Sequence, residues 1–272
     1  MILDALRAEL YKLSRNGWST FWAFGFMPLF ALASGLIEQA FVHLYLGDVI
    51  PYAAPLEDSL KGMATLSTSV FQLCAIAGAA ILFGGEYRWE TWRAALTRNN
   101  RIPVMLAKLL AFAIAISASL LLASLARLIV GLVDAGLTGG AHWPPVSASD
   151  VALAHLIGFS ATLLQVMVTA SFVMMVCVIS RAMTAGIVAS LLVLVAIEIA
   201  SIRGNAGGDP IWTLFPNIAA ASIRQSGERT LGDVDTLLHG FALPGLASLV
   251  LWFLAFTTAA LVLFTRQDLS KE

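Results

Sequence analysis

The sequence predicts an all-α integral membrane protein with six transmembrane helices. Of its 272 residues, 59% are hydrophobic and only 12% are charged, whereas soluble domains carry about 25% charged residues. The charges are also segregated, which leaves apolar stretches of about 20 residues, the length that crosses the hydrocarbon core of a bilayer. The alternation that is typical of barrel strands is absent, and helices are the other structure that satisfies every backbone polar group in lipid.

Six stretches are predicted to span the membrane, within a single transmembrane domain that covers 1–272. They lie at about 18–37, 63–83, 104–133, 151–180, 182–202 and 239–264. The second and fourth stretches contain no charged residue, whereas Lys108 and Arg127 interrupt the third and Glu198 lies near the end of the fifth.

The first 16 residues are predicted to form an amphipathic helix that lies on the membrane surface. Leucines recur along one face at helical spacing, at Leu3, Leu6, Leu10 and Leu13. Charged side chains fill the other faces, which is the pattern of an interfacial helix. We expect the chain to turn into the first span near Asn16 and Gly17. A simple topogenic anchor explains the composition equally well.

Lysine and arginine residues set the expected orientation. With the N-terminus in the cytoplasm, eleven of them fall on inner segments: Arg7, Lys12, Arg15, Arg88, Arg93, Arg98, Arg101, Lys108, Arg181, Arg266 and Lys271. Five fall on outer segments: Lys61, Arg127, Arg203, Arg224 and Arg229. The positive-inside rule therefore predicts that both termini and the segment 86–101 are cytoplasmic. The expected location is a plasma membrane, the inner membrane of a bacterium.

The outer segment 203–238 contains a stretch, "DPIWTLFPNIAAASI", that is apolar but too short to span. Pro210 and Pro216 would break a continuous helix there. We predict a re-entrant or interfacial helical hairpin before the sixth span. The alternative is an ordinary loop that lies on the outer leaflet.

The segment 86–101 is the elaborate one of the two inner connections, since the other, "SRAMT", is minimal. As a helix it would place Trp89, Trp92 and Leu96 on one face. Tryptophan and arginine together are typical of a helix at the lipid headgroups. A loop that lies on the membrane explains this composition, but a rigid, charged element is also what a soluble partner could bind.

Three stretches resemble the permease subunits of ABC transporters of the type-2 exporter class. They are "LRAELYKLSR" at the start, "GGEYRWETWRAALTRNNRIPVMLAKLL" after the second span and "FTRQDL" after the last. Within the second stretch, the positions that match the family pattern are Glu86, Tyr87, Thr91, Leu96, Thr97, Arg101 and Lys108. The plan of six spans with a long last outer segment is also similar.

This resemblance implies a dimeric permease, as a homodimer or with a related permease, in which each copy contacts one of two cytoplasmic ATP-binding-cassette subunits. It implies that 86–101 is the cytoplasmic coupling helix, that 1–16 is the connecting helix and that 203–238 is re-entrant. The implied interface with the ATPase comprises Glu86, Tyr87, Arg88, Trp89, Thr91, Trp92, Arg93, Arg98 and Arg101.

No nucleotide-binding loop of the form G-x-x-x-x-G-K-[ST] occurs in the sequence. The pair Gly84–Gly85, which we expect at a helix junction, lacks the lysine and hydroxyl residue that would follow. We therefore expect no enzymatic activity and no cofactor in this chain, with ATP and magnesium bound by the partner subunit. Membrane lipid is an expected partner and nucleic acid is not.

Three charged residues fall near the outer ends of the spans: Glu38, Arg127 and Glu198. Charged groups within a membrane are costly and often functional, so these residues are candidates for a polar substrate path. The simpler interpretation is an ion pair with Arg127, or side chains that extend to the interface.

The histidines and methionines give no clear metal site. The four histidines, His43, His142, His155 and His239, all map to the outer side, and no pair has the spacing of metal ligands. Three methionines in the fourth span, Met167, Met174 and Met175, leave a copper-linked exporter open. For an intramembrane protease, Ser160 and His155 share one span but point in different directions.

The expected function is export of a hydrophobic or amphiphilic substrate, such as a lipid-like molecule, a drug or an antimicrobial peptide, which would give multidrug or peptide resistance. The alternative is a membrane anchor or assembly factor that recruits a soluble partner without transport. A secondary transporter would need inverted repeats and a polar site at mid-depth, and neither is visible in the sequence.

Overall fold

The computed structural model describes residues 2–46, 54–89, 91–92, 100–138, 140–141, 147–204, 210–228 and 242–268, with the side chains of 46 and 202–210 left out. Over these residues the chain is helical and contains no β-strand. Six helices are long and apolar enough to cross a membrane: Gly17–Tyr45, Ser69–Arg88, Arg101–Thr138, Ala148–Ser180, Met183–Ser201 and Ala242–Arg266. The prediction of an all-α chain with six candidate spans is confirmed.

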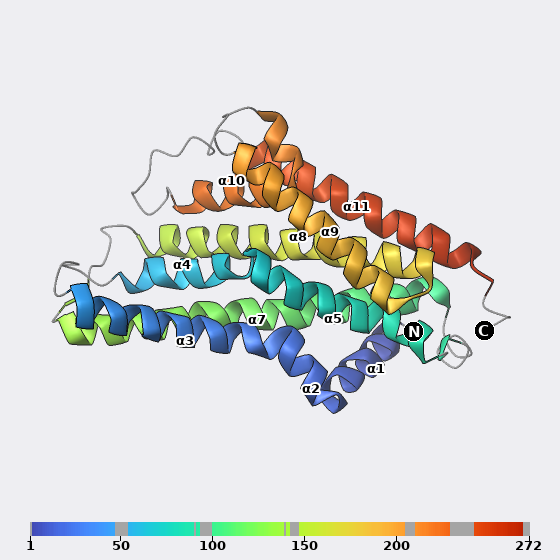
Figure 1. Ribbon diagram of the computed structural model, residues 1–272, viewed down its shortest axis with the longest axis horizontal. Coiled ribbons are helices and arrows are strands. Elements are labelled where there is room, and N and C mark those ends of the chain that lie inside the picture. The colour runs from blue at the N-terminus through green and yellow to red at the C-terminus, as the bar shows by residue number, and fades with distance from the viewer. Residues whose placement is uncertain are drawn as a thin grey trace.

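The chain begins with α1 (Ile2–Arg15), and Asn16 separates this helix from the first candidate span. The first candidate span then runs through α2 (Gly17–Thr20), the π-helical turn η1 (Phe21–Gly25), α3 (Phe26–Phe41) and a second π-helical turn, η2 (Val42–Leu46). Figure 1 shows α1 folded back at an angle to this span. The span continues beyond residue 37, its predicted end, and the charge of Glu38 is paired with Arg127 of α7.

The predicted second span, 63–83, begins too early. Residues 63–65 belong to a separate helix, α4 (Pro55–Thr65), and the span itself is α5 (Ser69–Arg88). Thr68 has an extended backbone, with φ −71° and ψ 153°, and separates the two helices. Helix α4 packs closely on α7, since a Cβ atom at Gly62 would lie 2.5 Å from the carbonyl oxygen of Ala123.

Two helices are much longer than a membrane is thick. Helix α7 (Arg101–Thr138) has 38 residues, and α8 (Ala148–Ser180) has 33, which correspond to about 57 Å and 50 Å. A capping box between Ser147 and Asp150 starts α8. Since the hydrocarbon core is only about 30 Å thick, both helices are longer than the core, and α3 and α4 lie alongside α7 (Figure 1).

The remaining helices pack against α8. Arg181, with a left-handed φ of 55°, makes the short turn from α8 into α9 (Met183–Gly204). The short 3-10 helix η3 (Pro210–Leu214) and α10 (Pro216–Glu228) follow, where the re-entrant hairpin is predicted, and α11 (Ala242–Arg266) ends the described chain. Residues 239–241 of the predicted sixth span lie outside the described residues.

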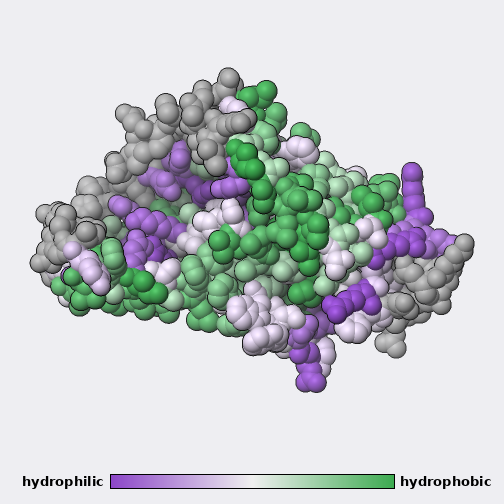
Figure 2. Space-filling view, viewed as in Figure 1, coloured by the Kyte–Doolittle hydropathy of each residue, from purple (hydrophilic) through white to green (hydrophobic). Residues whose placement is uncertain are grey.

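The core lies among α3, α5, α7, α8 and α11. Its largest fully buried side chains include Phe71, Phe83, Phe112, Ile116 and Phe264. On the face shown in Figure 2, hydrophobic side chains cover the middle of the molecule and hydrophilic ones gather toward its two ends. This distribution is that of a chain that crosses a bilayer.

Gly84 and Gly85 lie inside α5, so the expectation of a helix junction there is wrong. Gly84 is a point of close approach between α5 and α9, because a Cβ atom at this position would lie 2.7 Å from the Cα atom of Met183. Gly85 has open space around it. The first glycine is explained by close helix packing rather than by a turn.

Candidate functional site

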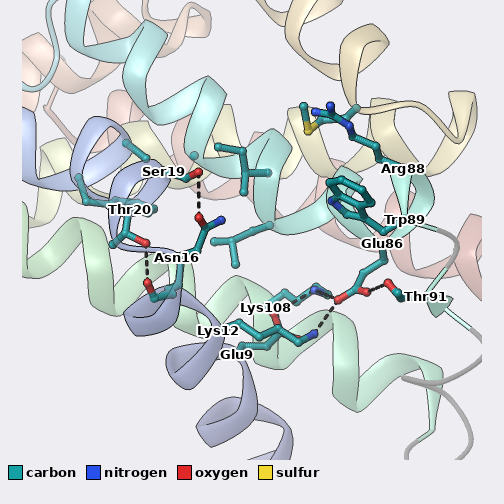
Figure 3. A pocket seen from close by; sticks show the side chains of 18 residues that line it. Glu9, Lys12, Asn16, Ser19, Thr20, Glu86, Arg88, Trp89, Thr91 and Lys108 are labelled. Carbon is teal, nitrogen blue, oxygen red and sulfur yellow. Dashed lines mark hydrogen bonds and ion pairs between the residues drawn. The ribbon is translucent and has the colours of Figure 1, made fainter.

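Four charged side chains meet where α1, α5 and α7 come together (Figure 3). Lys108 of α7 donates hydrogen bonds to Glu9 of α1 at 2.9 Å and to Glu86 of α5 at 3.0 Å. Lys12 of α1 contacts the same two carboxylates at 2.8 Å and 2.7 Å. We call these four residues the ion cluster. It contains two positive and two negative charges and is therefore neutral.

Burial makes this pairing necessary. The side chain of Lys108 is only 2% exposed, and those of Glu9 and Glu86 are 6% and 11% exposed. An unpaired ion at such a place costs several kcal/mol. Helical spacing places Glu9 and Lys12 on one face of α1, and the hydroxyl of Thr91 also donates to Glu86. The ion cluster therefore fixes α1 to two other helices and to the start of the segment 91–92.

Lys12 is the most exposed member of the cluster. Burial disfavours its charge, but hydrogen bonds from Lys12 to Glu86 and Glu9 outweigh this effect and raise the pKa of Lys12 above its usual 10.5. Because this pKa is raised in the folded chain, the ion pairs of Lys12 contribute fully to the stability of the fold at any pH below the usual lysine pKa. This contribution is lost only as the pH rises through the raised pKa, in the strongly alkaline range.

An aromatic group lies beside the ion cluster. The ring of Trp92 lies 5.3 Å from that of Tyr87 and 4.7 Å from that of Phe264 in α11. The Nζ atom of Lys108 lies 5.7 Å from the Trp92 ring, within the range of a cation–π contact. The hydroxyl of Tyr87 donates to Gln267, 2.8 Å away. Trp92 is fully buried, so its ring stabilises the interior of the chain.

Arg101 fixes the other end of the segment 86–101. Its Nη1 atom donates to the carbonyl oxygens of Phe264, Thr265 and Gln267 at 3.1, 3.0 and 2.6 Å. These carbonyls end α11, where a cation also meets the negative end of the helix dipole. Both ends of 86–101 are therefore attached to the bundle, at Glu86 and at Arg101.

The predicted interface residues divide into two groups. Glu86, Tyr87 and Trp92 are buried, whereas Arg88 and Trp89 face outward, with Trp89 70% exposed. The prediction that Trp89 and Trp92 share one helical face is wrong, because α5 ends at Arg88. The chain leaves the helix after Arg88, and the Trp92 ring packs between the rings of Tyr87 and Phe264. Arg93 and Arg98, with Leu96 and Thr97, lie outside the described residues.

Sequence reasoning missed the partners of Glu86. It treated Glu9 and Lys12 as part of the polar face of an amphipathic helix and Lys108 only as an inner charge at the start of a span. The available signal was the position of Lys108, about one turn inside the predicted third span. A lysine there needs a partner within the bundle.

A cleft of about 820 Å³ opens beside the ion cluster, between α1–η1 and α5 (Figure 3). One part of its wall is polar and comprises the charged ion cluster, Arg88 and the hydroxyl of Thr91. Another part is apolar, with Phe24, Ile81 and Leu82. This combination suits an amphiphilic molecule.

At the other end of the bundle, the structure brings together two of the three predicted path residues. Both terminal nitrogens of Arg127 donate to one carboxylate oxygen of Glu38 at 3.1 Å. Glu198 lies elsewhere, on α9, and is exposed. The ion pair that the sequence left open for Arg127 is thus present, and Glu198 belongs to a separate site with Asn217.

The described histidines make pair contacts. Nε2 of His43 lies 2.9 Å from Asp134, and Nε2 of His155 lies 2.6 Å from the hydroxyl of Ser59. Ser59, in the unpredicted α4, is buried and therefore not available to a substrate. Within the described ranges, no three histidine, cysteine or carboxylate side chains group as metal ligands. His142 and His239 lie outside those ranges.

No protein-family model matches the chain, and no curated protein or solved structure matches it. The features available for inferring a function are the ion cluster, the attached segment 86–101 and the cleft beside them.

Proposed function

We propose that the chain is the membrane-spanning subunit of an ATP-driven exporter of the type-2 class, powered by a separate ATP-binding-cassette subunit that holds ATP and magnesium. In this proposal the segment 86–101 is the coupling helix and α1 is the connecting helix. Two copies of the permease, or this chain and a related one, work with two ATP-binding subunits.

The observation that carries the proposal is the set of contacts made by Glu86. This carboxylate joins α5 to Lys12 of α1 and to Lys108 of α7, while Arg101 joins the far end of the segment to α11. A push on 86–101 would therefore act on four helices at once. Packed, paired groups move together rather than yielding separately, which is what force transmission requires.

In this proposal the distribution of lysine and arginine residues sets the orientation of the chain in the membrane. The segment 86–101 and both termini are cytoplasmic, in a bacterial inner membrane. The arrangement supports this, because α1, the end of α5 and the end of α11 lie at the same end of the bundle (Figure 1). Most of the lysine and arginine residues that the structure describes belong to segments predicted to be inner. The helices η3 and α10 form the outer re-entrant element.

The proposed substrate is hydrophobic or amphiphilic. The cleft beside the ion cluster supports this class, because its wall changes from charged groups to Phe24, Ile81 and Leu82 over a short distance. ATP binding to the partner would favour an outward-open state by binding it more tightly than the inward-open one.

A membrane anchor without transport activity is the second candidate. Arg88 lies 5.3 Å from the exposed ring of Trp89, so the two side chains together form a surface that a soluble protein could bind. Aromatic and arginine residues are the most frequent anchors of such interfaces. The anchor would bind its partner without coupling to ATP hydrolysis.

Copurification tests the docking part of the proposal. The tagged chain, purified from its own host in mild detergent, should bring down an ATP-binding-cassette protein. Charge reversal at Arg93→Glu with Arg98→Glu should reduce the recovered partner by at least tenfold, because rim charges that steer binding would repel it.

The matched control reverses two charges on another segment predicted to be inner, with Arg266→Glu and Lys271→Glu. It should leave recovery of the partner unchanged. Full recovery with the Arg93 and Arg98 double variant would move the dock away from 86–101.

A further inference from the structure

A second polar site lies where α5, α8, α9 and α10 meet, at the opposite end of α5 from the ion cluster. It surrounds a cavity of about 250 Å³. Eight polar residues line it, and six of them, Thr68, Ser69, Gln165, Glu198, Asn217 and Arg224, form what we call the outer polar pocket. A water molecule occupies about 30 Å³ in the liquid, so the cavity has room for about eight waters or for a small polar group.

The two charged groups of the pocket are held apart. Arg224 donates to Oε1 of Gln165 at 3.2 Å, and Nε2 of Gln165 donates to Asn217 at 2.8 Å. Asn217 in turn lies 3.5 Å from the carboxylate of Glu198. Two amide side chains thus separate a guanidinium from a carboxylate. Among the described residues, Arg224 and Glu198 form no ion pair with each other, and the carboxylate that interacts electrostatically with Arg224 is Glu228 on the same helix.

The start of α5 adds hydrogen-bond donors for an anion. Thr68 precedes this 20-residue helix, and its side chain makes no capping hydrogen bond to the first amides, since its hydroxyl donates to Thr65 instead. Free amides at a helix start favour a negative group.

The geometry points to a binding site for a zwitterionic phosphoethanolamine headgroup. The phosphate would lie between the start of α5 and Arg224, and the ammonium would lie against Glu198. A phosphate suits a guanidinium because two parallel hydrogen bonds are possible. The headgroup carries its opposite charges a few bonds apart, as the pocket does. This inference concerns the chain alone and does not depend on ATP-driven export.

The position of the pocket favours a lipid as the source of the headgroup. The predicted spans place the start of α5 and the last turns of α9 near one surface of the hydrocarbon region. In Figure 2, hydrophilic side chains gather on that side of the hydrophobic middle, near α10. A lipid could therefore place its headgroup in the pocket while its acyl chains remain beside α9.

Lipid binding to the purified full-length chain tests the inference, measured by native mass spectrometry with phosphatidylethanolamine and phosphatidylglycerol. The wild type should bind phosphatidylethanolamine more tightly. Glu198→Gln should remove this preference, with about a tenfold weaker binding of phosphatidylethanolamine only, because a charged hydrogen bond is lost. Glu198 is exposed and makes one long contact, so the variant should fold normally.

Arg224→Gln should weaken both lipids by about tenfold, and Arg127→Gln, which removes an arginine from a different site, should change neither. Soluble O-phosphoethanolamine shows whether the headgroup binds by itself. If it displaces bound phosphatidylethanolamine, the headgroup is sufficient for binding. If it does not, the acyl chains of the lipid are also required. Equal binding of both lipids by the wild type, or an unchanged preference in Glu198→Gln, would overturn the inference. Copurification of an ATPase is a separate measurement, so either proposal can fail alone.

Discussion

Replacing Lys108 by methionine should destabilise the protein by about 3–5 kcal/mol, the usual cost of removing one partner from a buried ion pair. Methionine keeps most of the length of the lysine side chain, so the change removes mainly the charge. Glu9 and Glu86 would lose their common buried partner at 2.9 and 3.0 Å. Unfolding of the purified protein in detergent, followed by circular dichroism, measures the loss.

Two controls separate charge from packing. Lys61→Met removes a lysine that is also paired, with Asp58 at 2.9 Å, but its side chain is 62% exposed, so the expected loss is at most about 1 kcal/mol. The triple variant Lys108→Met, Glu9→Gln and Glu86→Gln should recover most of the stability, because no buried charge is left unpaired. Lys12 loses both carboxylates in this variant, but its side chain is 52% exposed. Equal losses for Lys61→Met and Lys108→Met would show that the ion cluster is not buried as described.

The two neighbouring tryptophans should respond very differently to alanine. Trp92→Ala should cost about 3–5 kcal/mol, because it leaves a cavity among Tyr87, Lys108 and Phe264. Trp89→Ala should change stability by no more than about 0.5 kcal/mol, because its ring is 70% exposed. The same unfolding measurement compares them.

The pair of tryptophans also separates internal packing from partner binding. Trp89→Ala should weaken recovery of the ATPase partner while leaving the chain stable. If Trp92→Ala kept full stability and lost only the partner, Trp92 would be a docking residue, and the packing around Phe264 would need another explanation.

The fold class was predictable because the length of an apolar stretch is a local property. The six spans, the break at Asn16 and the two short helices between 210 and 228 all follow from runs of apolar residues and from proline. Helix α4 was missed because its sequence, with Asp58 and Lys61, is that of an ordinary polar loop, and its helix is stabilised by packing on α7. The boundary at Thr68 depends on that same tertiary contact.

The site was only partly predictable. Glu86, Tyr87 and Arg101 were identified from a local motif, but their partners lie far away in the sequence: Lys12 for Glu86, Gln267 for Tyr87 and the end of α11 for Arg101. Sequence periodicity places residues on a face of one helix and does not say which helix packs there. For the same reason, Trp92 was expected on the surface with Trp89 and is instead in the core.

The central claim is that a separate ATP-binding subunit drives the chain by pushing on the segment 86–101 and, through it, on the helices joined at Glu86. Measurement of ATP hydrolysis tests this claim most directly. The chain purified alone should hydrolyse no ATP, and the chain reconstituted in vesicles with its ATP-binding partner should do so in a way that an amphiphilic substrate stimulates. Robust hydrolysis by the chain alone, with contaminating ATPases excluded, would contradict the account.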